Sequence, residues 1–210
     1  LRIPRTQSKH QIYGTAVHVA LQDLFDRVRE GEEVSKEYLN DRFKVNLRKH
    51  MLTPKDFAQI YERGMQALEG YYDMYEKDWE TNVLNEVSIA EVVIKRDIRL
   101  TGKIDKVEIA TGSLGVNVVD YKTRKPLSRN DITGKTKSST GSYKRQLVFY
   151  KILVDKFWEG KYHMVSGELD FVEPTTAGKY RKERFEIGEA EVAELEELIQ
   201  DTVQEILELT

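Results

Sequence analysis

The chain has 210 residues and a net charge of −3, and with 40% hydrophobic and 33% charged residues it can bury one good core beneath a well-solvated surface. It contains no cysteine, which excludes disulfides, zinc–thiolate sites and iron–sulfur clusters and fits a reducing, cytoplasmic compartment. It shows no signal peptide and no apolar run long enough to span a bilayer, so we expect no membrane partner. From its length and composition we expect a single domain over residues 1–210. Because the sequence begins at Leu1 without a methionine, we expect this domain to be a fragment of a larger chain.

Helical spacing of apolar residues characterises the first eighty positions. After a polar stretch at 1–13 that we expect to be irregular, this spacing predicts helices over 14–29 and 35–50. Thr53 followed by Pro54 predicts the start of a third helix, with threonine as N-cap and proline in the first turn. The aromatic stripe of this third helix is typical of a core rather than of a binding platform.

From residue 83 onward the apolar period changes to two, which predicts strands. Three antiparallel strands in a meander are expected first, then a polar mobile loop, a helix, a pair of strands and a last amphipathic helix. The three strands of the meander cover 83–94, 98–109 and 114–121, the loop covers 125–142, and the helix covers 143–158. The pair of strands covers 164–172 and 179–187, and the last helix follows Gly188. The last helix is expected to face inward through Val192, Leu195, Ile199, Val203 and Ile206.

Charge is distributed unevenly along the chain. The acidic side chains of the last helix are Glu189, Glu191, Glu194, Glu196, Glu197, Asp201, Glu205 and Glu208. The segment after the third strand is basic instead, with only Asp131 opposing Lys122, Arg124, Lys125, Arg129, Lys135, Lys137, Lys144 and Arg145. Such a basic segment suits a phosphodiester substrate, although a solvated flexible loop explains the charge equally well.

The third strand begins as an apolar core strand and turns charged at its end, where Asp120 and Lys122 share one face. The strand before it carries Asp105, and a hairpin through 111–113 would bring Asp105 close to Asp120 and Lys122. Two carboxylates suit a hard cation such as magnesium, which lowers the pKa of a bound water. A neighbouring lysine can orient or deprotonate that water. The alternative for this strand alone is an edge strand with a surface ion pair.

Five landmarks then follow one another in a fixed order: residues 14–18, Glu86, 102–106, 120–123 and 146–150. Together they resemble the RecB-like branch of the PD-(D/E)XK nuclease superfamily, which includes nuclease domains fused to bacterial helicases related to UvrD. The resemblance covers about residues 1–150. It implies an α/β (α+β) fold with a restriction-endonuclease-like core, in which a central mixed sheet with an antiparallel meander is flanked by helices.

The resemblance also implies a role for each matching position. The implied metal ligands are His18, Asp105, Asp120 and the carbonyl of Tyr121. Glu86 matches an acidic position that completes the site, and Lys122 matches the catalytic lysine. Gln146 and Tyr150 match a helix motif that supports the site and touches the DNA backbone, near Arg124 and Lys125 of the basic segment. The expected cofactor is Mg²⁺ or Mn²⁺, without an iron–sulfur cluster.

Without the resemblance, His18 and Glu86 each have a more ordinary structural interpretation. A lone helical histidine such as His18 is more often structural than a ligand, and Glu86 would ordinarily be an outward-facing strand residue. The family often has arginine where Lys106 stands, which weakens any phosphate contact expected there. A helical segment that usually precedes the nuclease core would lie before Leu1.

The leading functional hypothesis is a metal-dependent deoxyribonuclease that serves a DNA repair or recombination helicase, with DNA and the helicase domains of the same or a partner chain as partners. The alternative is a catalytically inactive DNA- or protein-binding module of the same fold. Inactive copies typically lose the lysine or an acid, and this sequence keeps Lys122, Asp105 and Asp120. A third reading is a structural interaction domain that uses the acidic last helix. The sequence leaves open exonuclease or endonuclease mode, polarity, strand preference and metal count.

Overall fold

The computed structural model describes residues 7–158 and 160–209, apart from the side chain of Arg96. Contacts between Cα atoms divide the chain into two compact units. The first, here called the helical unit, comprises Leu1–Thr81, Tyr121–Pro126 and Phe171–Arg181. The second, the sheet unit, comprises Asn82–Asp120, Leu127–Asp170 and Lys182–Thr210. The expectation of a single nuclease domain stays a prediction.

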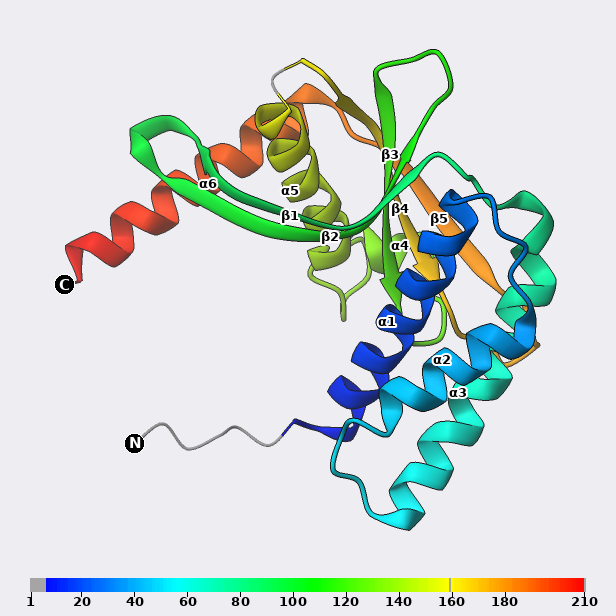
Figure 1. The fold of residues 1–210 in the computed structure, drawn as a ribbon. Coiled ribbons are helices and arrows are strands. Elements are labelled where there is room, and N and C mark those ends of the chain that lie inside the picture. Colours follow the sequence, from blue (N-terminus) through cyan, green and yellow to red (C-terminus); the bar gives the residue numbers. More distant parts are fainter. Residues whose placement is uncertain (1–6, 159, 210) are drawn as a thin grey trace. The chain divides into compact units, whose positions relative to one another are not determined.

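The helical unit contains three long helices whose starts are set by local capping residues (Figure 1). They are α1 (Lys9–Arg29), α2 (Lys36–Leu47) and α3 (Pro54–Tyr75), and a short 3₁₀ turn, Glu76–Asp78, follows α3. Ser8 forms a capping box with Gln11, so α1 begins at Lys9 and the expectation of irregular structure over 1–13 is wrong for 9–13. Residues 1–6 lie outside the described part. Thr53 caps α3 as predicted, and Ser35 caps α2.

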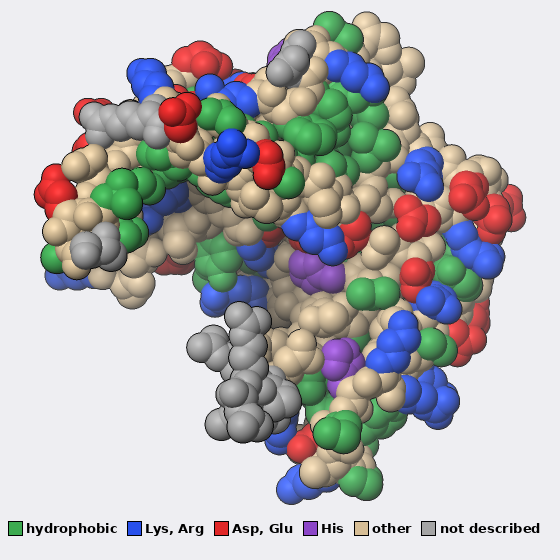
Figure 2. Space-filling view, turned by 60° about the vertical axis from the view of Figure 1, so that its left-hand side comes forward, with side chains coloured by type: hydrophobic (Ala, Val, Ile, Leu, Met, Phe, Trp, Pro, Cys, Tyr) green, Lys and Arg blue, Asp and Glu red, His purple; other side chains and the backbone are tan. Residues whose placement is uncertain are grey.

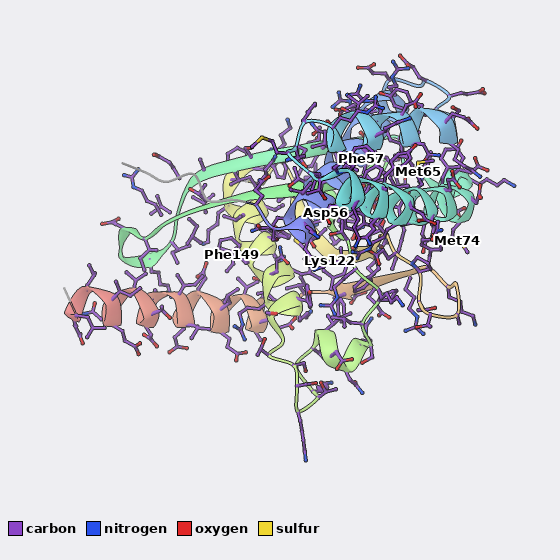
Figure 3. The ribbon with its side chains drawn as sticks, turned by 90° about the horizontal axis from the view of Figure 1, so that it is seen from below. Asp56, Phe57, Met65, Met74, Lys122 and Phe149 are labelled. Atoms are coloured by element: carbon purple, nitrogen blue, oxygen red, sulfur yellow. The ribbon has the colours of Figure 1, made fainter. Side chains whose placement is uncertain are left out.

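The core of the helical unit is aromatic, and its packing depends on one close helix approach. A Cβ atom on Gly64 of α3 would lie 2.2 Å from the Phe43 ring of α2, so only glycine lets the two helices meet there. Tyr13, Phe25 and Phe43 are buried in this core. Figure 3 shows Phe57, Met65 and Met74 spaced along α3. Among the aromatic residues of α3, Tyr71 is buried, whereas Phe57, Tyr61, Tyr72 and Tyr75 are half-buried, so the predicted core role of this stripe is confirmed only in part.

The sheet has five strands in the order β1-β2-β3-β4-β5. They are β1 (Val83–Val93), β2 (Arg99–Ile109), β3 (Gly115–Lys122), β4 (His163–Phe171) and β5 (Arg181–Glu186). The first three pair antiparallel, and Figure 1 shows β1 and β2 as one long, curved hairpin. The amide of His163 bonds to Leu114 O, and that of Val172 to Lys122 O, so β4 runs parallel to β3. The predicted mixed sheet with an antiparallel meander is confirmed.

Helix α5 (Ser142–Phe157) connects β3 to β4 and packs against β1, β2 and α6 (Glu189–Glu208). The predicted loop at 125–142 contains a short helix, α4 (Arg129–Ile132), whose Ile132 is buried. Asp131 accepts hydrogen bonds from its cap Ser128 and from Thr136. The segment is therefore not structureless, because these short polar side chains satisfy its backbone and bury one apolar anchor. Its mobility stays a prediction.

The predicted inward face of α6 is confirmed only in the first half of the helix. Leu195 is buried, whereas Ile206 is 55% exposed, and the intervening apolar positions are half-buried. Ion pairs Lys144–Glu191 and Lys156–Glu196 hold this first half against α5, and α5 does not continue beneath the second half. The periodicity identified the helix correctly, but it could not show how far the partner helix extends.

Basic and acidic side chains are interspersed on the face drawn in Figure 2. Among the described residues, no helix combines the length and the hydropathy that crossing a membrane requires.

Candidate active site

Two acidic residues face each other across β1 and β2 of the sheet unit. Val87 pairs with Ile104, and one step along this register places Glu86 opposite Asp105. A carboxylate oxygen of Glu86 lies within 4.8 Å of one of Asp105. Glu86 has a φ of 52°, a conformation that costs a non-glycine residue about 1–3 kcal/mol and that concentrates at functional positions. Strand patterning alone predicts that Glu86 faces outward, and only the family resemblance assigned it to a site.

A third acidic residue continues this row on β3. Lys106 pairs with Val119, and one further step of the same antiparallel register brings Asp105 opposite Asp120. The hairpin predicted from the sequence therefore brings these two carboxylates to neighbouring strands. Asp120 is only 3% exposed, whereas Asp105 and Glu86 are half-buried. Asp120 is therefore the most deeply buried of the three acids.

Helix α5 supplies two hydrogen-bond donors to Asp120. Nε2 of Gln146 donates to Oδ1 of Asp120 at 2.9 Å, and the hydroxyl of Tyr150 donates to the same oxygen at 2.9 Å. Gln146 also donates to the Tyr150 oxygen at 2.8 Å, so the two donors hold each other in place. Their spacing of four residues puts both on one face of the helix, as predicted. These bonds compensate the buried carboxylate for its lost hydration.

The hydroxyl of Tyr150 is suited to donation rather than to acid–base chemistry. Burial raises the pKa of Tyr150 far above its ordinary value, and the nearby charges of Asp120 and Asp105 raise it further. The phenol therefore stays protonated at physiological pH and remains a hydrogen-bond donor to Asp120. Its role is to orient this carboxylate.

The pair Glu86 and Asp105 fits a hard divalent cation. Two oxygens that bind one Mg²⁺ at about 2.1 Å lie at most about 4.2 Å apart, so a small side-chain rotation would let both reach one ion. Lys103, two residues before Asp105 on β2, forms an ion pair with Glu86 and is 61% exposed. An ammonium already contacts this carboxylate, which shows that the position attracts cations.

The remaining predicted residues lie in the helical unit. His18 of α1 is half-buried, and its ring packs edge-on against Tyr121 with 6.0 Å between centroids. A Cβ on Gly14 would lie 3.2 Å from Oγ1 of Thr123, so α1 packs closely on the residues that follow the end of β3. Tyr121 is buried against Phe25. Metal binding by His18 and by the Tyr121 carbonyl stays a prediction.

Lys122 ends β3, two residues after Asp120, and is half-buried, whereas Arg124 and Lys125 are exposed. Figure 3 labels Lys122 among the side chains seen from below. Alternation along a strand gives Asp120 and Lys122 the same face, as the sequence predicts. The catalytic role of Lys122 and the DNA contacts of Arg124 and Lys125 stay predictions.

A buried ion-pair network on strands β2 to β5 was missed by sequence reasoning. Lys106 is 1% exposed and pairs with Glu108 at 2.9 Å, so it is not placed to contact a phosphate. Arg184 pairs with Glu168 at 2.9 Å, and Lys182 with Asp170 at 3.2 Å. The signal was present as charged residues at alternate positions of three strands: Lys106 and Glu108 of opposite sign, the two acids Glu168 and Asp170, and the two bases Lys182 and Arg184.

Comparisons with known proteins assign the chain to a family. No curated protein sequence matches the chain. A solved structure titled "Crystal structure of SSO0001" is similar at 13% identity, over 88% of this chain and 85% of that chain. Its TM-score of 0.38 is too low to support an argument. The family model described as "PD-(D/E)XK nuclease superfamily" matches residues 1–209, which include Asp105, Asp120 and Lys122. The chain therefore belongs to the PD-(D/E)XK nuclease superfamily.

Proposed function

We propose that this protein is a metal-dependent deoxyribonuclease that hydrolyses phosphodiester bonds. The observation that carries the proposal is the row of Glu86, Asp105 and Asp120 on three neighbouring strands, with Lys122 two residues beyond the last acid. Membership of the superfamily supports the same activity. An inactive binding module would have no need to keep three carboxylates and a lysine in this order, because removing charged groups from water costs free energy.

The proposed site would hold Mg²⁺ or Mn²⁺ through Asp105 and Asp120, with Glu86 completing the acidic set. When bound, such an ion lowers the pKa of a coordinated water and neutralises charge on the phosphate. Gln146 and Tyr150 keep the Asp120 carboxylate in one orientation. This fixed orientation favours binding, because less side-chain freedom is lost when a ligand arrives.

Further roles extend the proposal to the helical unit. His18 and the carbonyl of Tyr121 would add ligands, and a nitrogen ligand among oxygens makes manganese acceptable alongside magnesium. Lys122 would orient the attacking water or stabilise the negative charge that builds on the phosphate. Arg124 and Lys125 are exposed cations that would contact the DNA backbone without reading its sequence.

The biological setting is proposed from the resemblance alone. Nuclease domains of the RecB-like branch act beside helicases related to UvrD, so we propose that this chain serves a helicase in DNA repair or recombination in the cytoplasm. The helicase domains would belong to the same or to a partner chain.

Cleavage of end-labelled single- and double-stranded DNA tests the activity. We expect cleavage with Mg²⁺ or Mn²⁺, none with EDTA, and none from Asp105→Asn. Asp97→Asn is the matched control, because Asp97 is an exposed aspartate on the same hairpin, and its positive φ of 56° is one that asparagine adopts. Absence of cleavage with either metal, combined with tight DNA binding, would replace the nuclease with the binding module.

A further inference from the structure

A cavity of about 620 Å³ lies in the helical unit, and none of its lining residues belongs to the acidic row. It is formed where the last turns of α1 and α3 meet the connection between α1 and α2. Glu32, Glu33, Tyr72, Glu76 and Trp79 are among its lining residues. Its volume is in the range that accommodates a small ligand or a large side chain. Nothing in the proposed nuclease chemistry uses it.

Aromatic rings form a preassembled wall of this cavity. The Tyr72 and Trp79 rings meet edge to face, with 5.2 Å between centroids and 86° between planes. Phe25 packs on Trp79 at 5.5 Å, and the Tyr72 hydroxyl donates to the carbonyl of Val34 at 2.7 Å. These contacts fix both rings before any ligand arrives. The faces of tyrosine and tryptophan carry the negative quadrupole that attracts cations.

The electrostatics of the cavity also favour a cation. Glu76 caps the C-terminus of α3, whose last turn carries no basic residue. The carbonyl end of a helix is already negative, so a carboxylate there is unfavourable unless a cation is bound nearby. Exposed Glu32 and Glu33 add two further acids, and Arg27 pairs with Glu32 at 2.9 Å. Three carboxylates and two helix C-termini thus converge on one hollow, with Arg27 paired to Glu32 and the ammonium of Lys36 5.9 Å from the centroid of the Tyr72 ring.

These features select among possible ligands. A negative cavity repels the DNA backbone, so its occupant is not the proposed substrate. A guanidinium stacks on aromatic faces and forms paired hydrogen bonds with carboxylates, whereas an ammonium is a strongly hydrated point charge. Nε1 of Trp79 is buried and donates no hydrogen bond among the described residues.

We propose that this cavity binds an arginine side chain presented by a protein partner. The arginine would stack on Tyr72 or Trp79 and pair with Glu76, which places a protein-docking point in the helical unit. This proposal is independent of the nuclease chemistry, because none of its residues belongs to the acidic row.

Nuclear magnetic resonance on the intact chain tests the proposal, with N-acetyl-arginine amide as the probe. We expect a saturable shift of the Trp79 indole N–H resonance, while that of Trp158, the other tryptophan, stays in place. The lysine amide should bind more weakly, and the citrulline amide, which has the same shape without the charge, should not bind. Failure of the Trp79 resonance to shift, or an equal shift with citrulline, would overturn the proposal.

Variants then assign the binding to the acids of the cavity. Glu76→Gln should weaken arginine binding at least threefold. Glu33→Gln provides a second test at an exposed position, where surface substitutions usually change stability little. Glu62→Gln is the matched control, because Glu62 is exposed on the same helix and does not line the cavity. Unchanged affinity in both cavity variants, with intact circular dichroism, would refute the assignment.

Discussion

Replacing Tyr150 with phenylalanine removes one hydrogen bond and almost no volume from the interior of the sheet unit. The lost hydroxyl donates to Oδ1 of Asp120 at 2.9 Å, and both residues are buried. Gln146 continues to donate to the same oxygen, so the carboxylate keeps one partner. The substitution therefore isolates a single bond to a buried acid.

The magnitude follows from the type of bond. A hydrogen bond to a charged acceptor contributes about 1.5–3 kcal/mol. For a protein of this size each kcal/mol shifts the melting temperature by roughly 2–4 °C, so Tyr150→Phe should melt roughly 3–12 °C lower. Gln146→Leu should act in the same direction. The double variant should depart from additivity by about 0.5 kcal/mol or more, because both donors serve one oxygen.

Thermal unfolding followed by circular dichroism in EDTA measures this effect, since a bound metal would stabilise the folded state and mask it. Tyr162→Phe is the control, because Tyr162 is half-buried and packs its ring against Trp158. It should change stability by no more than about 0.5 kcal/mol. If Tyr150→Phe melts at the wild-type temperature, the hydroxyl does not support Asp120.

Three further predictions concern the metal, the basic segment and the ion-pair network. Calorimetry should show Mn²⁺ binding to wild type and much weaker binding to Asp120→Ala. The metal should also raise the melting temperature of wild type only. Equal binding by both proteins would show that Asp120 is not a metal ligand. Proteases should cut the 125–142 segment in the free protein and less when DNA is bound; resistance without DNA would show that it is not mobile. Burial alone would lower the pKa of Lys182, but the charges of Asp170 and its acidic neighbours raise it. Stability from Lys182 is therefore complete below its unfolded pKa of about 10.5 and is lost as pH rises through the higher folded value. Lys182→Met should be less stable than wild type at neutral pH and should lack this alkaline loss; parallel pH profiles for the two proteins would contradict the assignment.

Much of the fold followed from local periodicity. The change from helical spacing to a period of two at residue 83 located the meander, and the short turn at 111–113 fixed which residues oppose each other. The placement of Asp105 and Asp120 on neighbouring strands was predictable for this reason, because the register of a hairpin depends on its turn.

The burial of some residues depends on distant parts of the chain and could not be predicted from local sequence. The exposure of Ile206 depends on where α5 ends, which periodicity in α6 cannot reveal. The burial of Lys106 depends on pairing with Glu108 and on the strands that follow.

The early start of α1 at Lys9 was a missed local signal, since Ser8 and Gln11 have the spacing of a capping box. Glu86 acquired a role only from the resemblance, and its positive φ was not visible in the sequence.

The measurement that tests the nuclease proposal most directly is DNA cleavage by Lys122→Met, with DNA binding measured on the same protein. Methionine keeps most of the aliphatic stem, so folding should survive, and the acidic row and the exposed cations should still hold metal and DNA. Loss of such an electrostatic contact typically reduces rate by a factor of about 10²–10³. We predict that cleavage falls by at least this factor while DNA affinity stays within about tenfold, or ~1.4 kcal/mol. If Lys122→Met cleaves DNA as fast as wild type, the catalytic site has been assigned to the wrong residues.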